Sequence, residues 1–429
     1  MNEENKISAD PTKEFFINML TRDIATDRAI LDLIDNSIDA AQSNKIENPK
    51  IEITATSYEF KILDNCGGLD LETAKNYAFR FGRPKEAPET PNSVGQFGVG
   101  MKRTLFKLGT EFEVKSKRKN IAYAVSVDVN KWVNTDTWNF YFNTIGDESI
   151  KEGETQIHVS KLKDDISELF SEDAFINNLM REISSAYFEQ INKGFKIKFN
   201  KTSIKSKDIT IKKSSSLGVI KKTYTLNNVE ITITCGVSDR DKDDSGWYIT
   251  CNGRLVAEAD KTEMTGWGIN GNNKFHTDFA FFRGLVEFKC EDSSKLPWTT
   301  TKTGVEVDSK VYKSALHHMG LCMEPVLTFL RDRTEENTLY EQEEIASKPL
   351  AECIAEADTI RILEAPLSMS FDRPEKIVAP KKKKGYTTIS YTVPDAKLEK
   401  AKTSLNVRTA KEVGQKTFDY YYGYECEDE

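Results

Sequence analysis

Three short motifs near the start of the chain constrain its fold more than any other feature. The first, LDLIDNSIDA at residues 31–40, has apolar residues at helical spacing and places Asp32 and Asn36 on one helix face. The second, DNCGG at residues 64–68, ends an apolar segment that is typical of a strand. The third, GQFGVG at residues 95–100, opens a helical segment. Helix, strand and glycine turn in this order predict an α/β fold.

Each motif suits a specific chemistry. The carboxylate of Asp32 can polarise an attacking water, and the amide oxygen of Asn36 can bind Mg²⁺. Asp64, at a strand end before glycines, can accept a hydrogen bond from an adenine amino group. A glycine turn at a helix N-terminus directs backbone N–H groups at phosphates. Taken singly, the same patterns also suit a solvated helix face, a plain glycine turn and an ordinary loop.

Together the motifs N-x-x-D-A, D-N-x-x-G and G-x-F-G-x-G resemble those of the GHKL ATPases, which include gyrase, MutL, the Hsp-ninety chaperones, histidine kinases and MORC proteins. The resemblance covers residues 14–160. It implies a Bergerat fold, an α+β two-layer sandwich in which a mixed sheet carries helices on one face. ATP would then lie under a flexible lid at residues 82–100.

The resemblance also implies roles for individual residues. Asn36 corresponds to the Mg²⁺ ligand, Asp64 and Gly68 to the adenine-binding turn, and Thr155 to the threonine that supports the adenine-binding aspartate. Asp39 and Ala40 complete the helix motif. The residues expected around the lid and the phosphates are Gly95, Gln96, Phe97, Gly98, Val99 and Gly100.

Three positions depart from the family pattern. Asp32 stands where hydrolysing members usually have Glu as the general base, and the shorter side chain predicts slow hydrolysis because small displacements of a catalytic group are costly. Cys66 replaces the first glycine of the second motif, and Glu154 precedes Thr155 where glycine is usual. Each departure affects the mechanism more than the binding of nucleotide.

The middle of the chain resembles the transducer domain of gyrase, MutL and MORC. Strand-like segments between residues 195 and 290 precede a long helix expected over Asp308–Leu330, and Asn252-Gly253 predicts a type I′ hairpin turn. In that family a loop lysine reaches the γ-phosphate, and Lys302 stands in the corresponding loop, where it would stabilise charge on the transferred phosphoryl group. The alternative is an exposed loop lysine.

We expect four segments: a GHKL ATPase domain at 1–204, a transducer-like domain at 205–332, a charged helical linker at 333–384 and a small unit at 385–429. The linker ends with the lysines 381–384. The small unit has an alternating strand pattern at residues 389–393 and two helical patterns, the second capped by Asn406 or Thr409. This β-α-α layout resembles ribbon-helix-helix modules, which dimerise through the strand and can bind DNA. A plain helical hairpin is the alternative.

Composition limits the setting. The net charge of −8 disfavours a wholly basic nucleic-acid binder. Seven cysteines without a CxxC pair predict a reducing, cytoplasmic environment and argue against a zinc site. No apolar run approaches the roughly 18–20 residues of a membrane span, and no signal peptide is visible.

These observations predict a slow, nucleotide-gated homodimeric ATPase that uses ATP and Mg²⁺. The domain order is similar to that of MORC proteins, and the N-terminal segment is similar to uncharacterised bacterial GHKL proteins. By analogy, prokaryotic DNA transactions or antiviral defence against phage are the expected setting, with nucleic acid as a candidate partner. The alternative is an ATP-dependent switch or chaperone-like protein without significant hydrolysis. A histidine kinase is disfavoured because none of the four histidines precedes the first motif. A nuclease or topoisomerase is disfavoured because no metal-nuclease motif or cleavage domain is recognisable.

Overall fold

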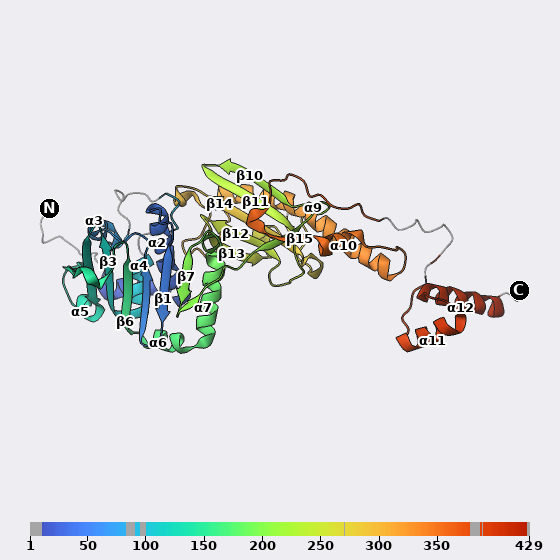
Figure 1. The fold of residues 1–429 in the computed structure, drawn as a ribbon, viewed down its shortest axis with the longest axis horizontal. Coiled ribbons are helices and arrows are strands. Elements are labelled where there is room, and N and C mark those ends of the chain that lie inside the picture. Colours follow the sequence, from blue (N-terminus) through green and yellow to red (C-terminus); the bar gives the residue numbers. More distant parts are fainter. Residues whose placement is uncertain are drawn as a thin grey trace, which may run out of the picture.

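The computed structural model describes residues 11–82, 91–94, 100–269, 271–377, 387 and 389–426. The chain forms a first unit around a large mixed sheet, a second unit around a smaller sheet, and a helical hairpin that lies apart at the C-terminal end (Figure 1). The predicted α/β fold class is confirmed.

The first sheet has eight strands in the order β5-β4-β3-β6-β2-β1-β7-β8. All neighbours are antiparallel except β1 and β7, which are parallel. The strands are β1 (Lys50–Ala55), β2 (Glu59–Asp64), β3 (Gly109–Arg118), β4 (Ile121–Asp128), β5 (Phe142–Thr144), β6 (Thr155–Leu162), β7 (Lys196–Phe199) and β8 (Thr202–Ser203).

The helices of the first unit are α1 (Lys13–Arg22), α2 (Thr26–Ser43), α3 (Leu71–Thr73), α4 (Gly100–Leu108), α5 (Val129–Val133), α6 (Asp164–Ser171), α7 (Asp173–Ala186) and α8 (Phe188–Asn192). Helices α2, at the first motif, and α4, after the glycine motif, lie where the sequence predicts them. A π-turn over Ala74–Ala78 extends α3. Short 3₁₀ turns occur in both units, at Asp147–Ser149, Glu263–Thr265, Thr277–Phe279, Ser293–Lys295 and Ile362–Glu364.

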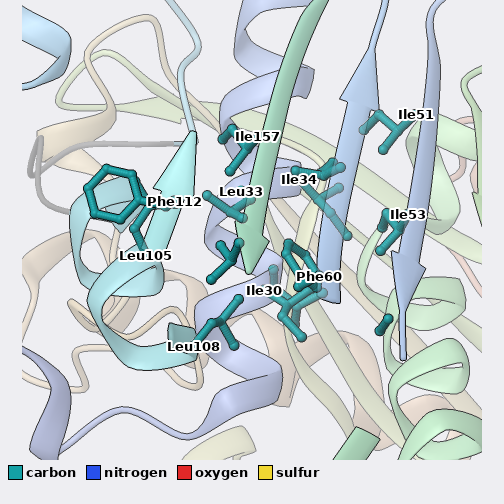
Figure 2. Close-up of a cluster of buried hydrophobic side chains, with 14 of the residues drawn as sticks. Ile30, Leu33, Ile34, Ile51, Ile53, Phe60, Leu105, Leu108, Phe112 and Ile157 are labelled. Carbon is teal, nitrogen blue, oxygen red and sulfur yellow. The ribbon is translucent and has the colours of Figure 1, made fainter. Parts of the chain in front are cut away.

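Helix α2 packs on the sheet through its apolar stripe. Figure 2 shows Ile30, Leu33 and Ile34 of α2 against strand residues that include Ile53 and Phe60. Burial alternates along β2, so Phe60, Ile62 and Asp64 point to the same buried side of the strand. The pleat therefore turns the motif carboxylate of Asp64 toward α2 rather than toward solvent.

The second sheet has five strands in the order β10-β11-β14-β12-β13. Asn252 and Gly253 have φ angles of 47° and 78°, so the predicted type I′ turn between β12 and β13 is confirmed. A long helix, α9, contacts β11 and β14 and buries apolar side chains such as Phe329. The elements are β10 (Ile220–Leu226), β11 (Val229–Val237), β12 (Gly246–Cys251), β13 (Arg254–Asp260), β14 (Phe282–Lys289) and α9 (Lys310–Glu341).

The segment predicted to be a linker packs on the second unit up to residue 377, the last residue of this segment that the structure describes. Helix α9 continues past Leu330 to Glu341, so a boundary at residue 332 falls inside a helix. Next, α10 (Pro349–Glu356) buries Leu350 and Ile354 in the core of the second unit. Strand β15 (Asp358–Arg361) then pairs with β9 (Thr210–Lys213). These few apolar contacts are spaced too widely in an acidic segment to be recognised from sequence.

The C-terminal hairpin consists of α11 (Asp395–Leu405) and α12 (Ala410–Glu425). Thr409 caps α12 in a capping box with Glu412, as one of the two predicted caps. Residues 389–394 form no strand in this single chain. Lysines 381–384 lie outside the described residues. In the part of the chain that the structure describes, no helix has both the length and the apolar character to cross a bilayer.

Candidate functional site

Asp64 marks one end of the candidate nucleotide site. Its carboxylate accepts hydrogen bonds from the Ser37 hydroxyl at 2.8 Å and from the backbone N–H of Cys66 at 2.9 Å. Burial raises the pKa of Asp64 above its ordinary value, although both hydrogen bonds oppose this effect. Sequence reasoning missed Ser37. The available signal was its position four residues after Leu33, on the stripe of α2 that faces the sheet.

The turn after Asp64 is held by β3 and β6. Thr155 is the register partner of Asp64, and its hydroxyl lies 2.9 Å from that of Ser116. The Ser116 hydroxyl also accepts a hydrogen bond from the N–H of Leu69. Gly68 has φ = +69°, and a Cβ there would lie 2.3 Å from the carbonyl oxygen of Lys117. The turn therefore requires glycine at 68, and Thr155 lies beside Asp64 as the motif predicts.

Asp32 marks the other end of the site. Gly100 begins α4, and a Cβ at this position would lie 3.2 Å from the Asp32 carboxylate. Asn36 is exposed on α2, one turn after Asp32. Asp39 accepts a hydrogen bond from the N–H of Val94 at 2.7 Å, and Ala40 packs against the core. The predicted residues Gly95, Gln96, Phe97, Gly98 and Val99 lie outside the described residues.

The Asp32 carboxylate contacts two cations from different parts of the chain. Arg103 of α4 forms an ion pair with Oδ2, and the ammonium of Lys302 lies 3.3 Å from Oδ1. Lys302 is only 6 % exposed, which excludes the alternative of an exposed loop lysine. A bridge between Trp298 and Val305 closes the base of its loop, and Lys302 adopts φ = 55° at the tip. We call residues 299–304 the Lys302 loop.

Asp35, one turn along α2 from Leu31, is the centre of a buried network. Its carboxylate lies 2.6 Å from the ammonium of Lys302 and 3.2 Å from Nε of Arg254, and it accepts a 2.7 Å hydrogen bond from Tyr187. Burial alone would raise the pKa of Asp35, but Lys302 and Arg254 outweigh it and hold that pKa below the ordinary value. Burial would likewise lower the pKa of Lys302, but Asp35 and Asp32 raise it. The ion pairs therefore stay charged.

Lys102 is a second residue that sequence reasoning missed. It lies in the first turn of α4, is buried, and donates a 2.7 Å hydrogen bond to the carbonyl oxygen of Ala78. Burial lowers the pKa of its ammonium to about 8. A buried cation two residues after the glycine motif is suitably placed to bind phosphate, and its position beside that motif was the available signal.

Lys102→Met is expected to stabilise the nucleotide-free protein by about 1–2 kcal/mol at neutral pH. Removal of a buried ammonium is stabilising, and loss of its hydrogen bond to the carbonyl oxygen of Ala78 offsets part of that gain. The pKa of Lys102 is about 8 in the folded chain against an ordinary 10.5. The buried ammonium therefore destabilises the folded wild-type chain to its full extent below about pH 8, and this effect disappears as the pH rises through 10.5. Chemical denaturation of both proteins from about pH 6 to about pH 10 measures the difference, and a difference that is independent of pH would contradict it. The variant should also bind ATP more weakly.

Residues 24–162 match the family described as histidine kinase-, DNA gyrase B- and HSP90-like ATPase. The matched range runs from the start of α2 to the end of β6 and includes Asp32, Asn36, Asp64 and Thr155. Over this range the first unit is therefore similar to the GHKL-type ATPases, the family that its motifs resemble. Comparison with curated proteins finds no match.

Proposed function

We propose that the chain binds ATP with Mg²⁺ between Asp64 and Asp32, hydrolyses it slowly, and closes as a homodimer when ATP is bound. In this proposal the second unit acts as a transducer. The observation that carries it is the position of Lys302, which the second unit places beside Asp32, at the end of the site opposite the adenine-binding Asp64. The match of residues 24–162 to ATPases supports the binding step.

The proposed roles follow from charge and position. Asp32 orients and deprotonates the attacking water, and Lys302 stabilises negative charge on the transferred phosphoryl group. Asn36 fits a Mg²⁺ ligand, because its amide is exposed one helical turn from Asp32 and Mg²⁺ prefers one or two protein oxygens together with phosphates and waters. When bound, Mg²⁺ would neutralise charge on the phosphates.

A switch without significant turnover is the second candidate, and one observation favours it. Both oxygens of Asp32 are occupied by cations, Arg103 on one and Lys302 on the other. These ion pairs occupy the oxygens that would otherwise accept a hydrogen bond from the attacking water. Release of labelled phosphate from ATP by the wild-type protein separates the two candidates, because the switch predicts binding without release.

The binding proposal is tested by isothermal titration of ATP and ADP. Asp64→Asn should weaken the binding of both nucleotides about tenfold, because the amide replaces one carboxylate oxygen by an NH₂ group that cannot accept a hydrogen bond. Asn36→Ala should weaken ATP only when Mg²⁺ is present, so that chelation of the metal removes the difference from wild type. The exposed Asp23→Asn is the matched control and should bind as wild type does.

Two results would contradict the proposal. One is absence of nucleotide binding by the wild-type chain, and the other is Asp64→Asn binding as tightly as wild type. Sedimentation of the same samples tests the homodimer. A non-hydrolysable ATP analogue, but not ADP, should increase the sedimentation coefficient.

A further inference from the structure

Asp35 joins the two units at a buried point. Helix α2 of the first unit supplies the carboxylate, the Lys302 loop and β13 of the second unit supply the two cations, and Tyr187 follows α7. Asp35, Arg254 and Tyr187 are each no more than 2 % exposed. A buried contact of this kind makes the relative position of the units depend on the charges that meet there.

The two cations of Asp35 are held differently. Arg254 is fixed by other contacts, since its Nη1 donates to the carbonyl oxygen of Leu255 and its guanidinium lies 4.8 Å from the centre of the Tyr187 ring. Lys302 is shared between Asp35 and Asp32, and so already faces the site of phosphate binding. Lys302 is therefore the cation that can change its partner.

The buried charges favour an incoming anion. Asp32 and Asp35 contribute two negative charges, whereas Arg103, Arg254 and Lys302 contribute three positive charges. Around Asp32 itself, Arg103 and Lys302 outnumber the single carboxylate by one positive charge, and this balance suits a phosphate group. If Lys302 moves toward a phosphate, Asp35 keeps Arg254 and Tyr187 as partners and is not left unpaired.

We propose that Asp35 is a positioning residue that holds Lys302 while the site is empty and releases it to the γ-phosphate of ATP. This inference rests on the proposed function. ATP must then compete with Asp35 for Lys302, whereas ADP has no γ-phosphate and does not. The exchange moves the Lys302 loop only when ATP is present, which links the second unit to the nucleotide state through differential contacts.

A double-mutant cycle tests this exchange. Affinities for a non-hydrolysable ATP analogue and for ADP, both with Mg²⁺, are measured for wild type, Asp35→Asn, Lys302→Gln and the double variant. Relative to wild type, Asp35→Asn should raise the ratio of the affinity for the analogue to the affinity for ADP by at least about fivefold. Lys302 leaves a neutral partner more easily than it leaves a carboxylate. Lys302→Gln should reduce the preference. When Asp35→Asn is added to Lys302→Gln, this ratio of affinities should stay the same, because the lysine that Asp35 restrains is absent.

The outcomes separate this inference from the proposed function. If wild type binds neither nucleotide, the proposed function fails. If both nucleotides bind but Asp35→Asn leaves the ratio of affinities unchanged, only the exchange is overturned. The same holds if Asp35→Asn changes the ratio by the same factor in wild type and in Lys302→Gln. A purely structural role of Asp35 would shift both nucleotides together and leave their ratio constant.

Tyr187→Phe provides a second, milder variant if Asp35→Asn does not fold. It removes one hydroxyl group that stabilises the Asp35 carboxylate after Lys302 has left. Asp35 should then retain Lys302 more strongly, and the preference for the analogue over ADP should fall about twofold or more. A preference that stays constant or rises would overturn the exchange.

Discussion

Asp32→Asn is expected to lower kcat for ATP hydrolysis by about 10²–10⁴-fold, the usual contribution of a general base. The amide keeps the shape of the side chain but cannot accept the proton of the attacking water. Binding of nucleotide should persist, because Asp64 is untouched and Arg103 and Lys302 are freed from a competing carboxylate. Phosphate release at saturating ATP measures kcat, and isothermal titration measures the affinity.

Asp27→Asn is the matched control for this experiment. Asp27 lies on the same helix, interacts with Arg28 and Glu182, and is outside the proposed site. Its turnover should equal that of wild type. Turnover by Asp32→Asn at the wild-type rate would assign the base to another residue. Tight binding by wild type without any turnover would instead establish the switch.

Asp35→Ala is expected to lower the free energy of unfolding by about 3–5 kcal/mol, the usual cost of removing one partner from a buried ion pair. The substitution leaves Arg254 and Lys302 buried without their shared carboxylate. Urea unfolding followed by tryptophan fluorescence measures the change. Asp27→Ala, which removes a partly exposed carboxylate from the same helix, should cost no more than about 1 kcal/mol.

The pH dependence of this difference follows from the depressed pKa of Asp35. The folded chain keeps the carboxylate ionised at pH values where the unfolded chain, with an ordinary pKa of 3.8, begins to bind a proton. The stabilisation by Asp35 is therefore fully present above that ordinary pKa and is lost as the pH falls through the lower folded pKa. A difference between wild type and Asp35→Ala that vanished already at neutral pH would contradict the ion-pair explanation.

The sequence by itself determined the features that depend on local pattern. Apolar periodicity predicted α2, the glycine motif marked the start of α4, the apolar segment before Asp64 predicted that it ends a strand, and Asn252-Gly253 predicted the hairpin turn. The three motifs also located the ATPase domain that the family match supports. These inferences succeed because the helix and strand periods fix which neighbouring residues share a face.

Only the tertiary structure decided which charges meet. In the sequence, Asp35 is one more acidic residue on an amphipathic helix, and the loop position of Lys302 indicates a role at the phosphates but no contact with Asp35. Their contact joins residues separated by 267 positions, and the contact of Asp35 with Arg254 spans 219. The packing of α7 against β13 brings these groups together, and burial then makes their pairing obligatory. Local periodicity carries no information about such pairs, because their energy arises from exclusion of water between surfaces that are distant in the sequence.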